Sequence, residues 1–208
     1  MRIGVLALQG DFIEHISLLK NLGVKAITVR KPDQLDSLSG LIIPGGESTT
    51  MMNLIRSFTF LQPLRELAKA GLPIMGTCAG MVLLAKKVSN SNMGTLSLMD
   101  IEVKRNAFGR QVDSFEAELD IPLLGNEPFP AIFIRAPLID KNGPGVEILS
   151  RLASGAAAAA SQGNILALAF HPELSGDTRL HRYFLETVAS YRLEKKNGVS
   201  QKAAISAD

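Results

Sequence analysis

The chain has 208 residues, of which 46% are hydrophobic and 20% are charged, and its formal net charge is +2. This composition is typical of a globular chain with one substantial core, and the near-neutral charge argues against a nucleic-acid partner. A single cysteine excludes an internal disulfide, and no apolar run reaches the length of a membrane span. Because the N-terminus lacks a basic start followed by a long apolar stretch, we expect a cytoplasmic protein without membrane attachment.

Strands and helices alternate in the first quarter of the chain. Apolar runs predict three buried strands, at 3–8, 24–29 and 40–43. Between the first two strands, apolar residues at helical spacing over 11–22 predict a helix, with Asp11 as a candidate cap and Gly23 as its end. This order predicts an α/β fold, a three-layer sandwich whose mostly parallel central sheet carries helices on both faces.

The pattern changes after Lys86. Three further runs predict short strands of antiparallel type, at 98–103, 114–119 and 132–134. The alanine-rich segment 156–160 favours a helix by propensity, but it is short, follows Gly155 and precedes a turn at 162–164. We therefore expect a strand there that pairs with 165–169.

The C-terminal part combines a helical stripe with a polar end. Apolar residues at helical spacing over 178–193 predict a closing helix packed on the sheet. The following segment, 194–208, is polar and rich in small residues. We therefore expect a single domain over 1–193 and a disordered tail over 194–208.

The only cysteine lies in a glycine-flanked turn, Gly76-Thr77-Cys78-Ala79-Gly80, between an apolar run and a helical pattern. This arrangement predicts a sharp strand-to-helix elbow, at which the flanking glycines avoid Cβ collisions and the sulfur is exposed. A helix N-terminus also favours the thiolate, which is the reactive form, so Cys78 is a candidate nucleophile. The alternative is a small buried thiol in the core, and the residues around Cys78 support the two about equally.

A glycine loop, PGGESTT at 44–50, follows the third predicted strand. Its two glycines allow backbone N–H groups to approach an anion or an oxyanion closely. The same residues also fit a turn in which Ser48 or Thr49 caps a helix, and both interpretations can hold together. Since ligands bind beyond the carboxyl ends of parallel strands, we expect this loop and Cys78 to face one crevice.

A second chemical cluster, FHPE at 170–173, ends the last predicted strand. Residues two apart in an extended segment point the same way, so Glu173 can orient one ring nitrogen of His171 and leave the other for Cys78. The alternative is a solvated pair on a surface loop. We interpret His15 and His181 as structural or exposed, and three scattered histidines with one cysteine offer no metal-ligand spacing.

Arginines at 105, 110 and 135 lie in loops or at strand ends. An arginine can clamp a substrate carboxylate through paired donors, whereas exposed surface arginines are the commoner outcome. The sequence by itself leaves these two interpretations open.

Together, GTCAG at 76–80, PGGEST at 44–49 and FHPE at 170–173 resemble the class I (triad) glutamine amidotransferases, which have a flavodoxin-like α/β fold. Four longer segments resemble the glutaminase subunits of pyridoxal 5′-phosphate synthase in particular. They are IGVLALQGDFIEH at 3–15, RNAFGRQ at 105–111, FIRAP at 133–137 and AFHPEL at 169–174. The resemblance covers residues 1 to about 192.

The resemblance implies a mechanism. Cys78 would attack the amide of L-glutamine and form a glutamyl thioester, His171 would transfer the protons, and Glu173 would orient His171. Backbone N–H groups of Gly46 and Ala79 would form the oxyanion hole. The implied glutamine contacts are Gly46, Glu47, Ser48, Arg105, Ile134 and Arg135. The resemblance implies no cofactor and no metal, and it implies a synthase subunit that receives the ammonia within a large hetero-oligomer.

Three alternatives stay open at this point. A binding module on an inactive amidotransferase fold would need a broken triad, but Cys78, His171 and Glu173 are all present. A cysteine hydrolase of another kind would lack the glutamine contacts. A glutaminase for another acceptor, such as imidazole-glycerol-phosphate synthesis, would lack the RNAFGRQ and FIRAP segments.

Overall fold

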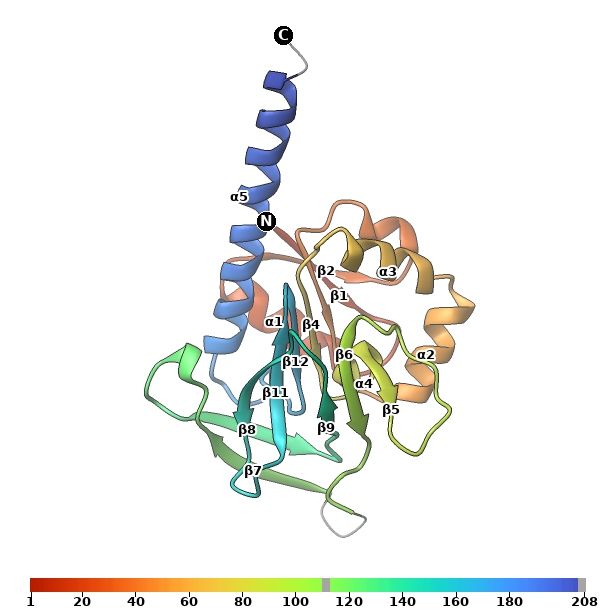
Figure 1. The fold of residues 1–208 in the computed structure, drawn as a ribbon, viewed down its shortest axis with the longest axis vertical. Helices are drawn as coiled ribbons and strands as arrows, with labels where there is room; N and C mark the ends of the chain where they lie inside the picture. The colour runs from red at the N-terminus through yellow and green to blue at the C-terminus, as the bar shows by residue number, and fades with distance from the viewer. Residues whose placement is uncertain (110–112, 206–208) are drawn as a thin grey trace.

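The structure is a computed structural model that describes residues 1–109 and 113–205 (Figure 1). Five parallel strands form its centre, in the spatial order β2-β1-β3-β4-β12. Their bounds are β1 Arg2–Leu6, β2 Lys25–Val29, β3 Gly40–Ile43, β4 Ile74–Thr77 and β12 Ile165–Leu168. This is the 2-1-3-4-5 strand order of flavodoxin-like folds, so the predicted fold class is confirmed.

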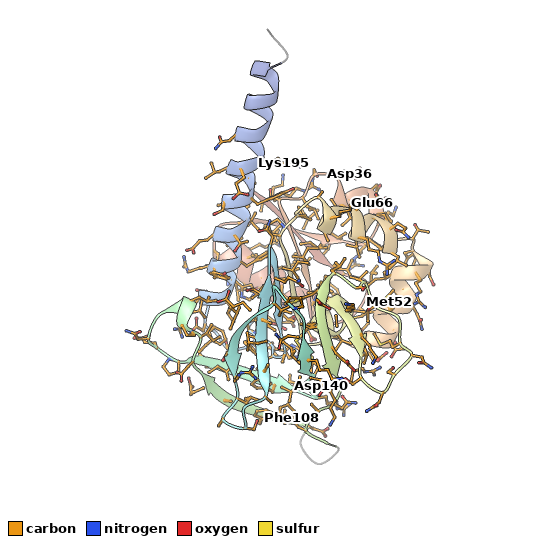
Figure 2. All side chains as sticks on the ribbon, in the orientation of Figure 1. Asp36, Met52, Glu66, Phe108, Asp140 and Lys195 are labelled. Carbon is orange, nitrogen blue, oxygen red and sulfur yellow. The ribbon has the colours of Figure 1, made fainter. Side chains whose placement is uncertain are left out.

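Helices cover both faces of the parallel strands, which gives the three layers (Figure 1). Helices α1 Phe12–Asn21 and α5 Arg179–Ile205 lie on one face, and α2 Ser48–Ser57, α3 Leu61–Lys69 and α4 Ala79–Leu84 lie on the other. Gly40 lets α5 approach closely, because a Cβ there would lie 2.7 Å from the Val188 side chain. Apolar side chains fill the space between the layers (Figure 2).

The remaining strands extend the sheet on the β12 side and are mostly antiparallel, as the sequence predicts. They are β5 Ala85–Val88, β6 Met99–Lys104, β9 Leu138–Asn142, β10 Glu147–Arg151 and β11 Ala157–Gln162. A separate two-stranded ribbon consists of β7 Ser114–Leu119 and β8 Phe129–Ile134. Two short 3-10 helices, η1 Pro32–Leu35 and η2 Pro122–Leu124, complete the elements.

The alanine-rich segment forms a strand and not a helix. Ala159 pairs with Leu168 in an antiparallel ladder, and Ala157 to Ala160 are all buried. Pairing on both sides of β11 and burial within the sheet outweigh the helix propensity of alanine. The predicted strand pairing is therefore confirmed.

Three local features differ from the sequence predictions. Helix α3 was not predicted, although Leu64 is buried on its inner face. The helix after Cys78 ends at Leu84, because Ala85 starts strand β5. Asp11 stands at the N-cap of α1 but makes no capping hydrogen bond with its side chain.

Helix α5 is longer than expected. The sequence predicted its end at Leu193 and a disordered tail over 194–208, whereas the described helix runs to Ile205. Figure 1 shows its last turns projecting away from the body, and Figure 2 places Lys195 where the helix leaves it. An isolated helical end gains no tertiary packing, so the domain boundary at 193 stays a prediction. Within the described residues, no helix is both long and apolar enough to cross a membrane.

Candidate active site

The candidate site lies where four neighbouring strands end. The loops after β1, β3, β4 and β12 all leave the same edge of the sheet, because these strands are parallel and adjacent. They carry Asp11, the glycine loop, Cys78 and the FHPE segment. The segments that the sequence predicted to share a crevice are therefore adjacent.

Cys78 occupies a strained elbow between β4 and α4. Its φ is 48° and its ψ is −107°, a backbone conformation that costs a non-glycine residue about 1–3 kcal/mol. A Cβ at Gly76 would lie 2.8 Å from backbone atoms of Gly80, and a Cβ at Gly80 would collide with the carbonyl oxygen of Ile43. The predicted elbow, with its need for both glycines, is confirmed, but the predicted exposure of the sulfur is wrong, because Cys78 is only 8% exposed in the structure. The Cys78 Sγ lies 3.7 Å from the carbonyl oxygen of Ile134.

His171 is held by backbone and by aromatic packing. Its N–H donates to the carbonyl oxygen of Ile132 in β8, at 2.8 Å. The preceding Phe170 packs against Phe133, with the ring centroids 5.5 Å apart. The Nδ1 atom of His171 lies 2.7 Å from Oε1 of Glu173, so the imidazole and the carboxylate point the same way, as the sequence spacing predicts. Both side chains are buried.

The electrostatics of this pair favour a protonated imidazole. Burial lowers the pKa of His171, but hydrogen bonds and charges of Cys78 and Glu173 outweigh burial and raise that pKa to about 10. Burial raises the pKa of Glu173, while the hydrogen bond from His171 opposes that rise. The geometry thus places an imidazolium between a sulfur and a carboxylate, the charge state that an activated cysteine needs.

The glycine loop packs directly against the imidazole. A Cβ at Gly45 would collide with Cε1 of His171 and would lie 2.9 Å from Oδ2 of Asp11. Gly46 has a φ of 153°, and a Cβ there would lie 2.5 Å from Oε1 of Gln9. Both positions therefore require glycine, since any side chain would displace the loop or the imidazole.

A cavity of about 350 Å³ lies beside Cys78. All six residues expected to contact glutamine line it, as does Ala79: Gly46, Glu47, Ser48, Arg105, Ile134 and Arg135. Sequence reasoning missed three further lining residues, Val82, Asn106 and Pro137. Val82 lies one helical turn after Cys78, so helical spacing could have predicted it. The other two lie within two residues of predicted contacts in the sequence.

Glu47 lines the cavity and also caps a helix. It caps α2, because its carboxylate accepts hydrogen bonds from the N–H groups of Thr49 and Thr50 at 3.0 and 2.7 Å. Burial opposes ionisation, but these hydrogen bonds lower the pKa of Glu47 to about 2. The cap is therefore Glu47 and not Ser48 or Thr49, since its longer side chain reaches both donors. Arg105 lies 3.4 Å from Glu47 Oε1.

Arg135 also lines the cavity, and its backbone is strained. Its φ of 44° is unusual for a non-glycine residue. Its side chain is 74% exposed and makes a 3.3 Å ion pair with Asp113, so most of its donors remain open to a ligand. Arg110, another candidate from the sequence, lies outside the described residues.

Of the two alternatives for His15 and His181, structural or exposed, the structure excludes the second. Both are fully buried, and His15 lies 3.3 Å from Oε2 of Glu173. Helical spacing alone could not show that α1 and α5 bring them behind the site.

One group of described side chains could hold a metal ion. The ligand atoms of Asp11, His171 and Glu173 all lie within 4.8 Å of one another. The short bond to Glu173 occupies Nδ1 of His171, so a cation would have to displace that proton. The arrangement therefore suits proton transfer better than metal binding.

Comparison with known proteins assigns the chain. The profile of the SNO glutamine amidotransferase family matches residues 5–190. The chain belongs to this family. It is 56% identical over 194 residues to the pyridoxal 5′-phosphate synthase subunit PdxT of Dehalococcoides mccartyi strain BAV1, covering 92% of this chain and 100% of the relative. It is 58% identical over 186 residues to PdxT of Pelotomaculum thermopropionicum, covering 89% and 94%.

A solved structure supports the same assignment. A crystal structure of a glutamine amidotransferase is 46% identical and has a TM-score of 0.85, covering 90% of this chain and 98% of the other. The predicted resemblance to the glutamine amidotransferases, and among them to the glutaminase subunits of pyridoxal 5′-phosphate synthase, is confirmed. The matched residues of the family include the elbow, the glycine loop and the FHPE segment.

Proposed function

We propose that this chain is the glutaminase subunit of a pyridoxal 5′-phosphate synthase and hydrolyses L-glutamine to glutamate and ammonia. Family membership and the names of the relatives support this function. The observation that carries the chemistry is the 2.7 Å bond from His171 to Glu173 beside Cys78, at a cavity lined by the expected glutamine contacts. The reaction is acyl transfer through a thioester.

In the first step the Cys78 thiolate attacks the side-chain amide carbon of glutamine. The imidazolium of His171 stabilises the thiolate, and Glu173 holds Nδ1 so that Nε2 faces the sulfur and the leaving nitrogen. Nε2 then gives its proton to the departing ammonia as the carbon–nitrogen bond breaks. A glutamyl thioester on Cys78 remains.

In the second step water hydrolyses the thioester. Neutral His171 takes a proton from the water, the resulting hydroxide attacks the acyl carbon, and the thiolate leaves as glutamate forms. N–H groups of Gly46 and Ala79 stabilise the oxyanion in both steps, since both residues line the cavity with Cys78. Removing one such donor typically costs about 3 kcal/mol of transition-state stabilisation.

Charged side chains at the cavity recognise the amino-acid end of the substrate. The Arg135 guanidinium, which is largely exposed, suits the α-carboxylate, and the ionised Glu47 suits the α-ammonium group. Arg105 holds Glu47, while Ser48 and Ile134 line the cavity beside them. A guanidinium and a carboxylate in one cavity fix the orientation of glutamine relative to Cys78.

The ammonia passes to a synthase subunit within a large hetero-oligomer. The names of the relatives support such a complex, because each is called a subunit of pyridoxal 5′-phosphate synthase. A single cysteine is consistent with a reducing compartment, so we place the complex in the cytoplasm.

Covalent labelling tests the nucleophile. A diazoketone analogue of glutamine should alkylate the wild-type chain once, and peptide mapping should find the label on Cys78. Excess glutamine should protect Cys78, whereas asparagine, one methylene shorter, serves as the control ligand. Labelling that persists in Cys78→Ala would overturn the assignment.

A second experiment tests the partner. The chain is mixed with a pyridoxal phosphate synthase subunit or with the synthase subunit of imidazole-glycerol-phosphate formation, and glutamate release is measured. We expect binding and stimulation with the first subunit only. If the first subunit neither binds nor stimulates, the pathway is wrong even where glutamine hydrolysis itself is observed.

A further inference from the structure

Two histidines from opposite ends of the chain meet behind the candidate triad. His15 of α1 and His181 of α5 are both fully buried, and their ring nitrogens Nδ1 and Nε2 lie 2.9 Å apart. Burying two imidazoles in a core is costly unless each ring finds hydrogen-bond partners. The mechanism given above uses neither residue, so the pair requires a separate explanation.

The second ring nitrogen of His15 faces the candidate triad. Its Nε2 lies 3.3 Å from Oε2 of Glu173 and 3.2 Å from Oγ1 of Thr77, the residue that precedes Cys78. The other oxygen of Glu173 accepts the bond from His171. Glu173 therefore lies between two imidazoles. Its buried Oε2 makes no hydrogen bond of good geometry among the described residues, and His15 Nε2 is the polar atom in close contact with it.

Proton counting fixes the direction of this chain of contacts. Burial, followed by the neighbouring His181 and His171, lowers the pKa of His15 well below its ordinary value, so the ring is neutral and carries one N–H. A carboxylate oxygen can only accept and the Thr77 hydroxyl can accept as well, so a proton on Nε2 of His15 suits both neighbours of that nitrogen. Nδ1 of His15 then accepts from Nε2–H of His181.

The reversed arrangement is less favourable. It would point the lone pair of His15 Nε2 at the Glu173 carboxylate. It would also place a proton on Nδ1 of His181, a buried atom without a partner among the described residues. A buried N–H without an acceptor is costly, and so is repulsion against a carboxylate.

We propose that His15 is a positioning residue of the glutaminase site, which holds the second oxygen of Glu173 through Nε2–H, and that His181 fixes the tautomer of His15. This inference rests on the proposed triad. Glu173 is thereby kept oriented and ionised while the charge on His171 changes during the reaction. The sequence shows no sign of this role, because the three residues are far apart in the chain.

The proposal predicts a shift in pH dependence. Glu173 faces His171, His15 and the Asp11 carboxylate, and His15 faces His181, His171 and Thr77. Removing the His15 imidazole takes away the polar group that lies 3.3 Å from the buried Oε2, so protonation of Glu173 becomes easier. The acidic limb of the kcat profile should therefore move to higher pH.

The test compares His15→Leu with His15→Gln in the complex with the synthase subunit. A glutamine amide can place its nitrogen near the position of imidazole Nε2 and donate to Glu173, whereas leucine cannot. For His15→Leu we expect kcat to fall about 10–100-fold with little change in KM, and the acidic limb to rise by about one pH unit. His15→Gln should restore most of the rate and the pH profile.

Leu19→Ala is the matched control, because Leu19 is buried on the same helix as His15 and its side chain has no hydrogen-bonding group. It should lower the melting temperature and leave the pH profile unchanged. Equal losses in His15→Leu and His15→Gln, or an unshifted profile in His15→Leu, would overturn the positioning role.

Nuclear magnetic resonance provides a test that needs no variant. The chain has three histidines, so long-range proton–nitrogen spectra of the labelled wild-type protein can be assigned. We expect His15 and His181 to be neutral Nε2–H tautomers around neutral pH. An Nδ1–H tautomer of His15 would overturn the proposal. This result is independent of whether the chain hydrolyses glutamine, which the Cys78→Ala variant tests.

Discussion

The candidate site draws on two parts of the molecule that are built differently. The parallel half supplies Cys78, His171 and Glu173, which are buried and fixed by strand ends, glycine contacts and hydrogen bonds. The antiparallel half and the β7–β8 ribbon supply Arg105 and Arg135, whose side chains are partly or largely exposed. The residues proposed for the chemistry are therefore buried, whereas the two arginines at the cavity have side chains that solvent can reach.

The difference has a physical reason. Proton transfer by His171 needs an imidazole that Glu173 holds in a fixed orientation within a low dielectric, which only packing on all sides provides. A charged substrate must first enter from water, so the groups that meet it need open hydrogen-bonding capacity. Substitutions in the two parts should accordingly separate into effects on kcat and effects on KM.

The largest effect should come from the buried part. His171→Asn removes the proton donor for the leaving ammonia and the partner of the thiolate, so glutamate release should fall by at least about 10³-fold. A coupled glutamate dehydrogenase assay of the complex measures this. Retention of more than a tenth of the rate would mean that another group acts as the base. The melting temperature of the variant shows whether it is folded at the assay temperature.

A single methyl group in the glycine loop should have the next largest effect. Gly45→Ala places a Cβ against the imidazole of His171 and near Asp11, so kcat should fall about 100-fold. Gly23→Ala is the matched control, because nothing lies within 4 Å of its Cβ and its φ of 73° costs stability alone. Similar activity of the two variants would show that the glycine loop shifts to accommodate the methyl group and that the imidazole of His171 stays in place.

An exposed arginine should affect binding more than turnover. Arg135→Ala removes the proposed partner of the substrate carboxylate, so KM for glutamine should rise about 10-fold while kcat changes less than about twofold. Lys141→Ala removes a similarly exposed cation outside the cavity and should change neither constant. A fall in kcat without a change in KM would place Arg135 in the chemistry.

The smallest effect concerns stability in acid. Burial lowers the pKa of His181 to about 4, from an ordinary value of 6.5, and His15 is lowered as well. As pH falls from 6.5 towards 4, the unfolded chain binds protons on these residues and the folded chain does not. The free energy of unfolding should therefore fall, by at most about 1.4 kcal/mol per pH unit for each histidine. His171 adds nothing in this range, since it is protonated in both states.

Urea unfolding at several pH values measures this loss. Glu173, whose pKa burial raises, opposes the trend, so the comparison that isolates the histidine is between wild type and His181→Leu. The variant should lose less stability on acidification. An equal loss in both proteins would show that His181 does not contribute to the pH dependence.

Local patterns in the sequence predicted much of the fold. The uninterrupted apolar runs predicted β3 and β12, and the glycine-flanked turn predicted the Cys78 elbow. The turn that follows β11 was stronger evidence than the helix propensity of alanine, and it correctly predicted the pairing of β11 with β12. These predictions held because each depends on interactions between residues close together in the chain.

Other features needed the folded structure. Helix α3 was missed although Leu61, Leu64 and Leu67 recur at helical spacing. The capping role of Glu47 was missed because Ser and Thr are the commoner capping residues. The strain at Arg135 could not be read from the sequence, because an arginine normally avoids a positive φ and the structure holds it there, with its N–H bonded to the carbonyl oxygen of Asp113.

The sequence by itself determined the class of chemistry. A cysteine between glycines and a histidine two residues before a glutamate require only local geometry to be recognised as a nucleophile and an oriented base. The tertiary structure decided how these groups are supported. The approach of α1 and α5 places His15 and His181 behind Glu173, because helices on one face of the sheet converge there. Contacts between segments so far apart in the sequence depend on how the helices pack on the sheet, which a local sequence pattern does not show.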